Sequence, residues 1–446
     1  MKMHKNILIS AAKYTITLLI TTIVCTILVV LTYALPTERM FLHAKESKES
    51  FNEAYIESWA PGIESATIPT QSDAIMINNA IFADSKHGAT HNAMMNPRYE
   101  NGRGNPRESL CSALDYKTSR DIKISRYAMT QVDSFKDEAN EGEALEAMYY
   151  PRYWHGYLVL LKPLLLFCNV SEIKMISTGF LLLLLFLAII LIREKISANA
   201  AVAFATMIVI INPVTIALSL HESIILLLTL MACSAVLLLS DEKNSEKRNY
   251  AFAVLGGATS FFDFLTYPLM TLGVPLAILL LLKRDEDRLE EQSMQASLAW
   301  GIGYAGLWIG KFLACSSLTD YNALYYGFQS VLFRVGSGEK SSQYETSVFA
   351  AIHKNVGVLI NWQTFAIIMI IATTIILAYR RGYRYKPNMK LVKGLLIIAT
   401  FPFIWYAVMS NHSTIHYYFT FRNLSVTWFC IAAVILMGWE KSSERR

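Results

Sequence analysis

The sequence predicts an all-α integral membrane protein with about ten transmembrane helices and a long first extracytoplasmic segment bearing interfacial helices. The chain of 446 residues is 54% hydrophobic and 17% charged, a balance that soluble domains seldom show. It contains ten apolar runs, and a helix needs roughly 20 mostly apolar residues to cross a bilayer. Its basic residues also lie at alternate connections between these runs, as they do in multi-pass proteins.

The apolar runs give the order of the elements. In lipid such a run must be helical, because its backbone polar groups have to be satisfied within the segment. The fifth and sixth runs could also be one segment broken around Asp263 to Pro268. The predicted spans are residues 7–33, 173–192, 199–217, 221–240, 249–264, 267–282, 296–315, 363–380, 391–409 and 423–439.

The spans divide the chain into five regions. The first run begins with basic residues and is longer than the apolar region of a cleaved secretory signal, so an uncleaved signal anchor is expected. The regions are the anchor 1–33, an extracytoplasmic segment 34–172, spans two to seven in 173–315, a second extracytoplasmic segment 316–362, and the last three spans with a cytoplasmic tail in 363–446.

The distribution of Lys and Arg predicts the orientation, because cytoplasmic loops near span ends carry the positive excess. The short loops 214–220, 265–266 and 410–421 contain no Lys or Arg. We therefore expect a multi-pass protein of the plasma (inner) membrane with cytoplasmic N and C termini. The clusters assigned to the cytoplasm are Lys2/Lys5, Arg193/Lys195, Lys243/Lys247/Arg248, Lys283/Arg284/Arg288, Arg380/Arg381/Arg384/Lys386/Lys390 and Lys441/Arg445/Arg446.

Charge and cysteine content exclude several classes. The formal net charge of +5 follows from topology, and no basic stripe with interleaved aromatic residues indicates nucleic-acid binding. The sequence also lacks a Gly-rich phosphate-binding loop, so it gives no indication of nucleotide binding. Cys111 and Cys168 are the cysteines of the outer region, where a disulfide is permitted but their spacing does not establish one.

The outer segments carry amphipathic stretches. The first segment ends in the aromatic block Tyr149 to Tyr157, followed by LVLLKPLLLF, which is too short before Lys162 and Pro163 to span the membrane. Because Tyr and Trp favour the headgroup level, an interfacial helix is expected there. A similar stretch runs from Tyr344 to Leu359.

Ionisable residues at membrane depth are rare and suggest function. Lys311 lies about one turn inside the outer end of the seventh span, and Asp263 lies at the outer hinge between spans five and six. His221 and Glu222 open the fourth span. The alternatives are that Lys311 extends to the headgroups and that Asp263 has a structural role.

The last outer loop contains His412 and His416, and Arg422 lies near the start of the final span. The four-residue spacing puts both histidines on one side of a helix. Two histidines can bind a metal, but a third ligand is missing, so no metal site is assigned and a divalent metal stays open as a cofactor. Aromatic rings and Arg also suit a sugar and a phosphate.

Asp73 begins an apolar helical pattern in the first outer segment. It is either a helix N-cap or first-turn acid, or a general base near the membrane surface. Arg152 and His155, in the aromatic block, either bind substrate or anchor the interfacial helix.

This combination of features resembles the GT-C superfamily of polytopic membrane glycosyltransferases. The resemblance implies transfer of a sugar from a polyprenyl-phosphate carrier to an extracytoplasmic glycan or protein acceptor, generally with inversion. It implies a catalytic acid in the first outer loop, here Asp73, with Asp263 or Glu38 as alternatives. The implied substrate-binding residues are Lys311, Arg152, His155, His412, His416 and Arg422.

The sequence departs from the GT-C pattern in that no acidic pair follows the first span closely, and Asp73 lies about 40 residues beyond it. The blocks YPRYWHGYLVLLKPLLLF and NHSTIHYYFTFR also resemble uncharacterised bacterial multispanning proteins. The competing hypotheses are a lipid-linked glycan flippase, transporter or polymerase, and a non-catalytic membrane scaffold. A transporter would carry its ionisable residues near the bilayer midplane.

Overall fold

A computed structural model describes residues 2–53, 55–56, 59–101, 104–129, 145–239, 245–284, 289–336 and 347–441. In this part of the chain the protein is mostly helical, and seven segments are long and apolar enough to cross a membrane. They are α1 (Lys2–Tyr33), α8 (Val170–Lys195), α11 (Leu220–Leu238), α14 (Leu289–Leu318), α17 (Trp362–Arg380), α18 (Met389–Ala399) with α19 (Phe401–Val408), and α21 (Tyr417–Thr420) with η5 (Phe421–Asn423) and α22 (Leu424–Met437).

The three remaining apolar runs are also helical. The third run forms α9 (Ala198–Ile210) and α10 (Pro213–Ala217), and the fifth and sixth form α12 (Ser245–Phe262) and α13 (Leu269–Leu282). However, α9 and α13 have only 13 and 14 residues, and α12 begins with the polar sequence SEKRN. The helical membrane-type architecture is confirmed, and the count of ten spans stays a prediction.

Glycines allow helices α12 and α14 (Leu289–Leu318) to pack closely. A Cβ atom at Gly256 of α12 would lie 2.0 Å from the carbonyl oxygen of Trp300, and one at Gly303 of α14 would lie 1.9 Å from that of Ala253. The two backbones touch at both points. Such contacts suit helices in lipid, where close packing replaces the hydrophobic effect between helices.

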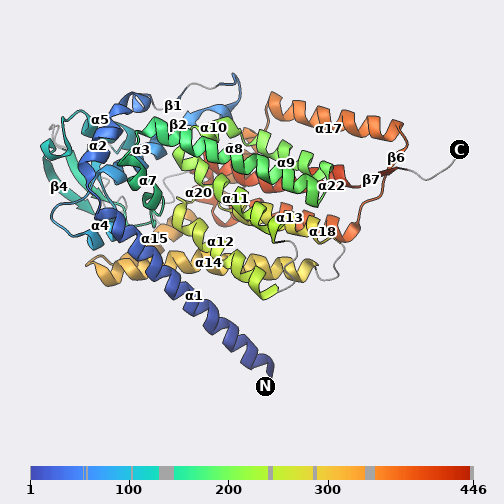
Figure 1. Ribbon diagram of the computed structural model, residues 1–446, viewed down its shortest axis with the longest axis horizontal. Helices are drawn as coiled ribbons and strands as arrows, with labels where there is room; N and C mark the ends of the chain where they lie inside the picture. Colours follow the sequence, from blue (N-terminus) through green and yellow to red (C-terminus); the bar gives the residue numbers. More distant parts are fainter. Residues whose placement is uncertain are drawn as a thin grey trace.

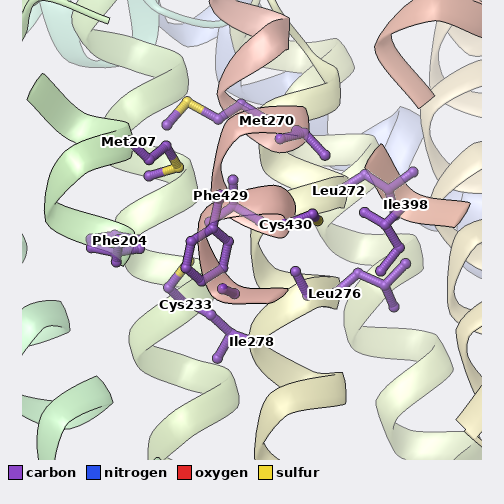
Figure 2. Close-up of a cluster of buried hydrophobic side chains, with 14 of the residues drawn as sticks. Phe204, Met207, Cys233, Met270, Leu272, Leu276, Ile278, Ile398, Phe429 and Cys430 are labelled. Atoms are coloured by element: carbon purple, nitrogen blue, oxygen red, sulfur yellow. The ribbon is translucent and has the colours of Figure 1, made fainter. Parts of the chain in front are cut away.

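The interior of the bundle is apolar. Figure 2 shows side chains of α9, α11, α13 and α22 in one cluster, which includes Phe204, Met207, Cys233, Leu276, Ile278, Phe429 and Cys430. All six cysteines of the chain are free, including Cys111 and Cys168.

The described residues of 37–168 form a separate layer, here called the loop domain, at one end of the bundle (Figure 1). It contains a three-stranded sheet of order β3-β5-β4, in which β3 pairs antiparallel and β4 parallel with β5. The sequence pattern did not predict these strands. The elements are α2 (Thr37–Glu46), β1 (Tyr55–Ile56), β2 (Ile68–Pro69), α3 (Gln71–Ile81), α4 (Ala89–Met95), β3 (Pro97–Glu100), α5 (Pro106–Leu114), β4 (Ile124–Met129), β5 (Leu145–Tyr149) and α7 (Leu158–Leu165).

The expected amphipathic stretches correspond to short helices. Helix α7 buries Leu158, Leu161 and Leu165 and leaves Leu160 exposed. In the second outer segment, α15 (Ala323–Arg334) is followed by α16 (Val348–Val358), whereas residues 344–346 lie outside the described residues. At the opposite end of the molecule, β6 (Tyr383–Tyr385) pairs with β7 (Trp439–Lys441) (Figure 1).

Candidate functional site

The connection between α12 and α13 is the centre of the candidate site. The ring of Phe264 lies 5.5 Å from that of Tyr153, 5.2 Å from that of His155 and 5.5 Å from that of His221, between centroids. Leu265 has a φ of 69°, in the left-handed region that a bulky side chain rarely adopts. Such strain persists only where the surroundings enforce it, and it is common at functional sites.

Asp263, directly after α12, is buried in this connection. Its carboxylate accepts hydrogen bonds from the Thr266 amide at 3.0 and 3.1 Å and from the Thr266 hydroxyl. Burial raises the pKa of this carboxyl to about 7, although the Thr266 donors act in the opposite direction. A carboxyl with that pKa can exchange a proton near neutral pH.

Arg334, at the end of α15, was not among the residues singled out from the sequence. It is 4% exposed, and its Nη1 lies 2.9 Å from Nδ1 of His412 while its Nη2 donates to the Tyr153 hydroxyl. Its Nε has no hydrogen-bond partner, and no carboxylate of the described residues pairs with it. Burial lowers the pKa of the guanidinium. Among the residues that the structure describes, Arg334 is therefore a buried cation without a carboxylate counterion.

His412, in α20 (Ser410–Ile415), joins Arg334 to the central connection. Because a guanidinium only donates, Nδ1 of His412 accepts, and its Nε2 then donates to the Leu265 carbonyl at 2.7 Å. The imidazole is therefore neutral. Burial lowers its pKa well below the usual value, and nearby His416 and Arg334 act in the same direction.

His416 lies beside His412, as the four-residue spacing predicted, with ring centroids 4.8 Å apart. It stacks on Phe419 at 5.2 Å, and burial lowers its pKa to about 3, with a smaller contribution from Arg334. Among the described residues, no group of three His, Cys, Asp or Glu is arranged to hold a metal ion.

His155 is buried on the other side of Phe264. Its Nδ1 lies 2.9 Å from the Tyr157 hydroxyl and its Nε2 3.0 Å from the Tyr150 carbonyl oxygen. Burial lowers its pKa well below the usual value, and the charge of Lys311 adds to the effect. Arg152 is partly exposed and lies 5.7 Å from the centre of the Tyr150 ring.

Asp73 is buried between the loop domain and the bundle. Its carboxylate lies 2.8 Å from Nζ of Lys174 and accepts hydrogen bonds from Ser219 Oγ at 3.0 Å and from the Leu220 and His221 amides at 3.1 and 2.9 Å. Burial alone would raise the pKa of Asp73, but Lys174 and the amides lower it below the usual value. Asp73 therefore caps the N-terminus of α11 rather than that of its own helix α3.

Arg422 and Lys311 are also bound to the protein itself. Arg422 forms a two-pronged contact with Glu222, at 2.9 and 3.1 Å, and both side chains are buried. Nζ of Lys311 lies 2.8 Å from the Met94 carbonyl oxygen and 3.3 Å from that of Ala93, near the C-terminus of α4. Lys311 thus points into the loop domain and binds the last carbonyl groups of α4. A cation is favourable at a helix C-terminus.

The structure brings part of the predicted set together. Asp263, His155 and His412 gather at the connection between α12 and α13, and His416 lies beside His412. Asp73 and Arg422 flank the adjoining first turn of α11. Lys311 and Arg152 lie towards Trp154 and Tyr150. Glu38 lies apart from this cluster in α2, where it accepts a hydrogen bond from Ser119. No sequence signal singles out Arg334, because the two outer segments contain many other basic residues.

An apolar groove of about 510 Å³ runs between α17 and α22. Val356 of α16 also lines the groove, and the neighbouring Asn355 donates to the carbonyl oxygen of Ser413 at 2.8 Å. The groove therefore lies close to the segment that carries His412. Its lining consists of Val356, Leu359, Ile368, Ile371, Ala372, Ile375, Phe403, Leu424, Thr427, Trp428, Ile431, Ala432 and Ile435.

No family model matches the chain, and no curated protein or solved structure is significantly similar to it. The chemistry of the site is therefore the basis for its function. A buried guanidinium attracts an anion, a carboxyl with a pKa of about 7 can take a proton from a hydroxyl, and the aromatic rings can stack on a sugar.

Proposed function

We propose that the protein is a membrane glycosyltransferase that moves a sugar from a polyprenyl-phosphate carrier to an extracytoplasmic glycan or protein acceptor. The observation that carries this proposal is Arg334, a buried guanidinium with a free Nε and no carboxylate partner among the described residues. A buried, unpaired charge is strongly unfavourable. A phosphate group bound at Arg334 would remove that penalty and match the planar donor fork of the guanidinium.

The apolar groove supports a lipid-linked substrate. It follows about three turns of α22, from Leu424 to Ile435, and Thr427 and Trp428 are the polar residues in its lining. A prenyl chain lying there would carry its phosphate to the loop-domain end of the bundle. The groove and the cation are thus suited to the two chemically different parts of one substrate.

Asp263 is the better candidate for the general base. Asp73 carries a lysine counterion and three hydrogen bonds, so its proton affinity is low. Asp263 receives hydrogen bonds from Thr266 and has a pKa of about 7. Asp73, Lys311 and Arg422 are then positioning residues that hold the loop domain and α22 against the site.

In the proposed reaction, Asp263 takes the proton of an acceptor hydroxyl as its oxygen attacks the anomeric carbon. The bond between that carbon and the phosphate oxygen breaks, and the phosphate leaves with both electrons. Arg334 stabilises the leaving phosphate, and His412 holds the guanidinium in place.

The proposed topology has ten spans in the plasma membrane, both termini in the cytoplasm and the loop domain outside. The basic residues near β6 and β7 support this orientation, because they lie at the end of the bundle opposite the loop domain (Figure 1). A transporter would place ionisable residues near the middle of its spans. The buried charged residues discussed above instead gather at the loop-domain end.

The test compares Arg334→Lys and Asp263→Asn with a matched control, Arg384→Lys in the exposed strand β6. Membranes with equal amounts of each variant are supplied with polyprenyl-phosphate sugars, and extracytoplasmic glycans are compared in the producing cells. We expect both site variants to lose transfer by about a hundredfold and the control to keep it. If both site variants made normal glycans at normal protein levels, the proposed glycosyltransferase activity would be refuted.

A further inference from the structure

The segment before α3 forms a small unit of its own, here called the strap (described residues 55–56 and 59–69). Its strands β1 and β2 form two residue pairs, and its own small core consists of Ala60, Ile63 and Ala66. A unit with so little buried apolar surface has low local stability. Its position must therefore depend on what surrounds it.

Single polar contacts attach the strap to three helix ends. The Pro61 carbonyl oxygen accepts a hydrogen bond from Nε1 of Trp362 at 3.4 Å, and Glu64 accepts one from the Tyr417 hydroxyl at 2.7 Å. Ser65 is bonded to Asn212, which precedes α10. The strap thus lies across the starts of α17, α21 and α10.

The strap exposes large aromatic side chains. Tyr55 is 59% exposed and Trp59 is 48% exposed. Trp362, which is hydrogen-bonded to Pro61 of the strap, is 60% exposed, and Ile360, two residues before it, is 79% exposed. Apolar rings grouped on one surface are unfavourable in water and mark a surface that meets an apolar partner.

The level of Trp362 identifies the partner. Trp362 is the first residue of α17, a candidate span whose exposed apolar face continues through Phe365, Ile368 and Ile370. The first turn of such a helix lies at the boundary between hydrocarbon and headgroups, where Trp and Tyr are enriched. Because Pro61 is hydrogen-bonded to Trp362, the neighbouring Trp59 lies near the same boundary.

We propose that the strap docks on the lipid bilayer, with Trp59 and Tyr55 inserted at the headgroup level. The bilayer then holds the strap where Glu64 meets Tyr417, next to His416 of the candidate site. Lipid contact replaces the large core that the strap lacks. This inference concerns the lipid surface and stands whether or not the protein transfers a sugar.

The test places a fluorophore on the strap of the full-length protein. Trp59→Cys and Tyr55→Cys are made in a Cys111→Ser/Cys168→Ser background, since those two thiols are partly exposed. Each is labelled with an environment-sensitive dye and reconstituted in phosphatidylcholine and phosphatidylglycerol vesicles containing lipids brominated near the headgroup. Phe365→Cys serves as a lipid-facing reference. Lys117→Cys, at an exposed position of the loop domain shortly after α5, serves as a water-facing one.

Bromolipid quenching at positions 59 and 55 is expected to be at least about threefold stronger than at position 117 and to approach that at position 365. Two strap positions guard against local misfolding of one variant. The proposal would be overturned if quenching at both strap positions were no stronger than at position 117. The dye at position 365 must still be quenched in the same experiment.

Discussion

Two buried carboxyl groups, Asp73 and Asp263, differ in their surroundings, and the difference sets their chemistry. Asp73 has a lysine counterion and the N-terminus of a helix, which together lower its pKa despite burial. Asp263 has neutral donors only, so burial dominates and its pKa rises to about 7. Asp73 therefore keeps its charge, whereas Asp263 changes protonation state in the physiological range.

The pKa of Asp263 predicts the pH dependence of activity. A general base acts in its deprotonated form, so transfer is expected to rise about tenfold per pH unit below the pKa and to level off above about pH 7. The measurement is the rate of sugar transfer in membranes across this range. A rate that stays constant from about pH 5 to about pH 8 would show that Asp263 is not the base.

The first turn of α11 holds the loop domain to the bundle. Its amides and the hydroxyl of Ser219 donate to Asp73 of α3, and Lys174 of α8 completes the ion pair. The positive end of the helix dipole adds to the attraction. Three elements distant in sequence thus meet at one buried carboxylate.

Loss of this carboxylate is expected to lower stability rather than the chemical step. Asp73→Asn leaves Lys174, whose side chain is 14% exposed, without its counterion, so unfolding should become easier by about 3 kcal/mol. The matched control is Asp115→Asn, because Asp115 pairs with Lys48 on the surface and such pairs contribute less than about 1 kcal/mol. Thermal unfolding in detergent measures the difference.

Activity per folded protein separates the two roles of Asp73. If it positions α11, the Asp73→Asn variant keeps much of its activity at low temperature, and Lys174→Met in the same chain restores part of the stability. An unchanged melting temperature with complete loss of transfer would instead make Asp73 the base.

At the scale of the whole molecule, the sequence predicts what depends on local pattern. All ten apolar runs are helical, because composition alone decides that outcome in lipid. The histidine pair is adjacent because its spacing matches the helix period. The partner of Asp73 could not be predicted, since Leu220 is 147 residues away. The left-handed Leu265 and the buried Arg334 likewise depend on tertiary packing, and no local pattern encodes them.

The proposed place of the lipid chain in the groove can be tested away from the chemistry. Ala372 of α17 lines the groove, whereas Ile370 on the same helix faces outward and is exposed. Ala372→Trp would fill part of the groove and is expected to raise the KM for a long polyprenyl-phosphate sugar about tenfold, with kcat nearly unchanged.

Two controls separate this effect from a general loss of activity. The KM for a short-chain donor that does not reach the groove should be unchanged. Ile370→Trp adds the same ring to the outer surface and should change neither constant. Equal effects of the two variants, or an equal effect on both donors, would place the lipid chain elsewhere.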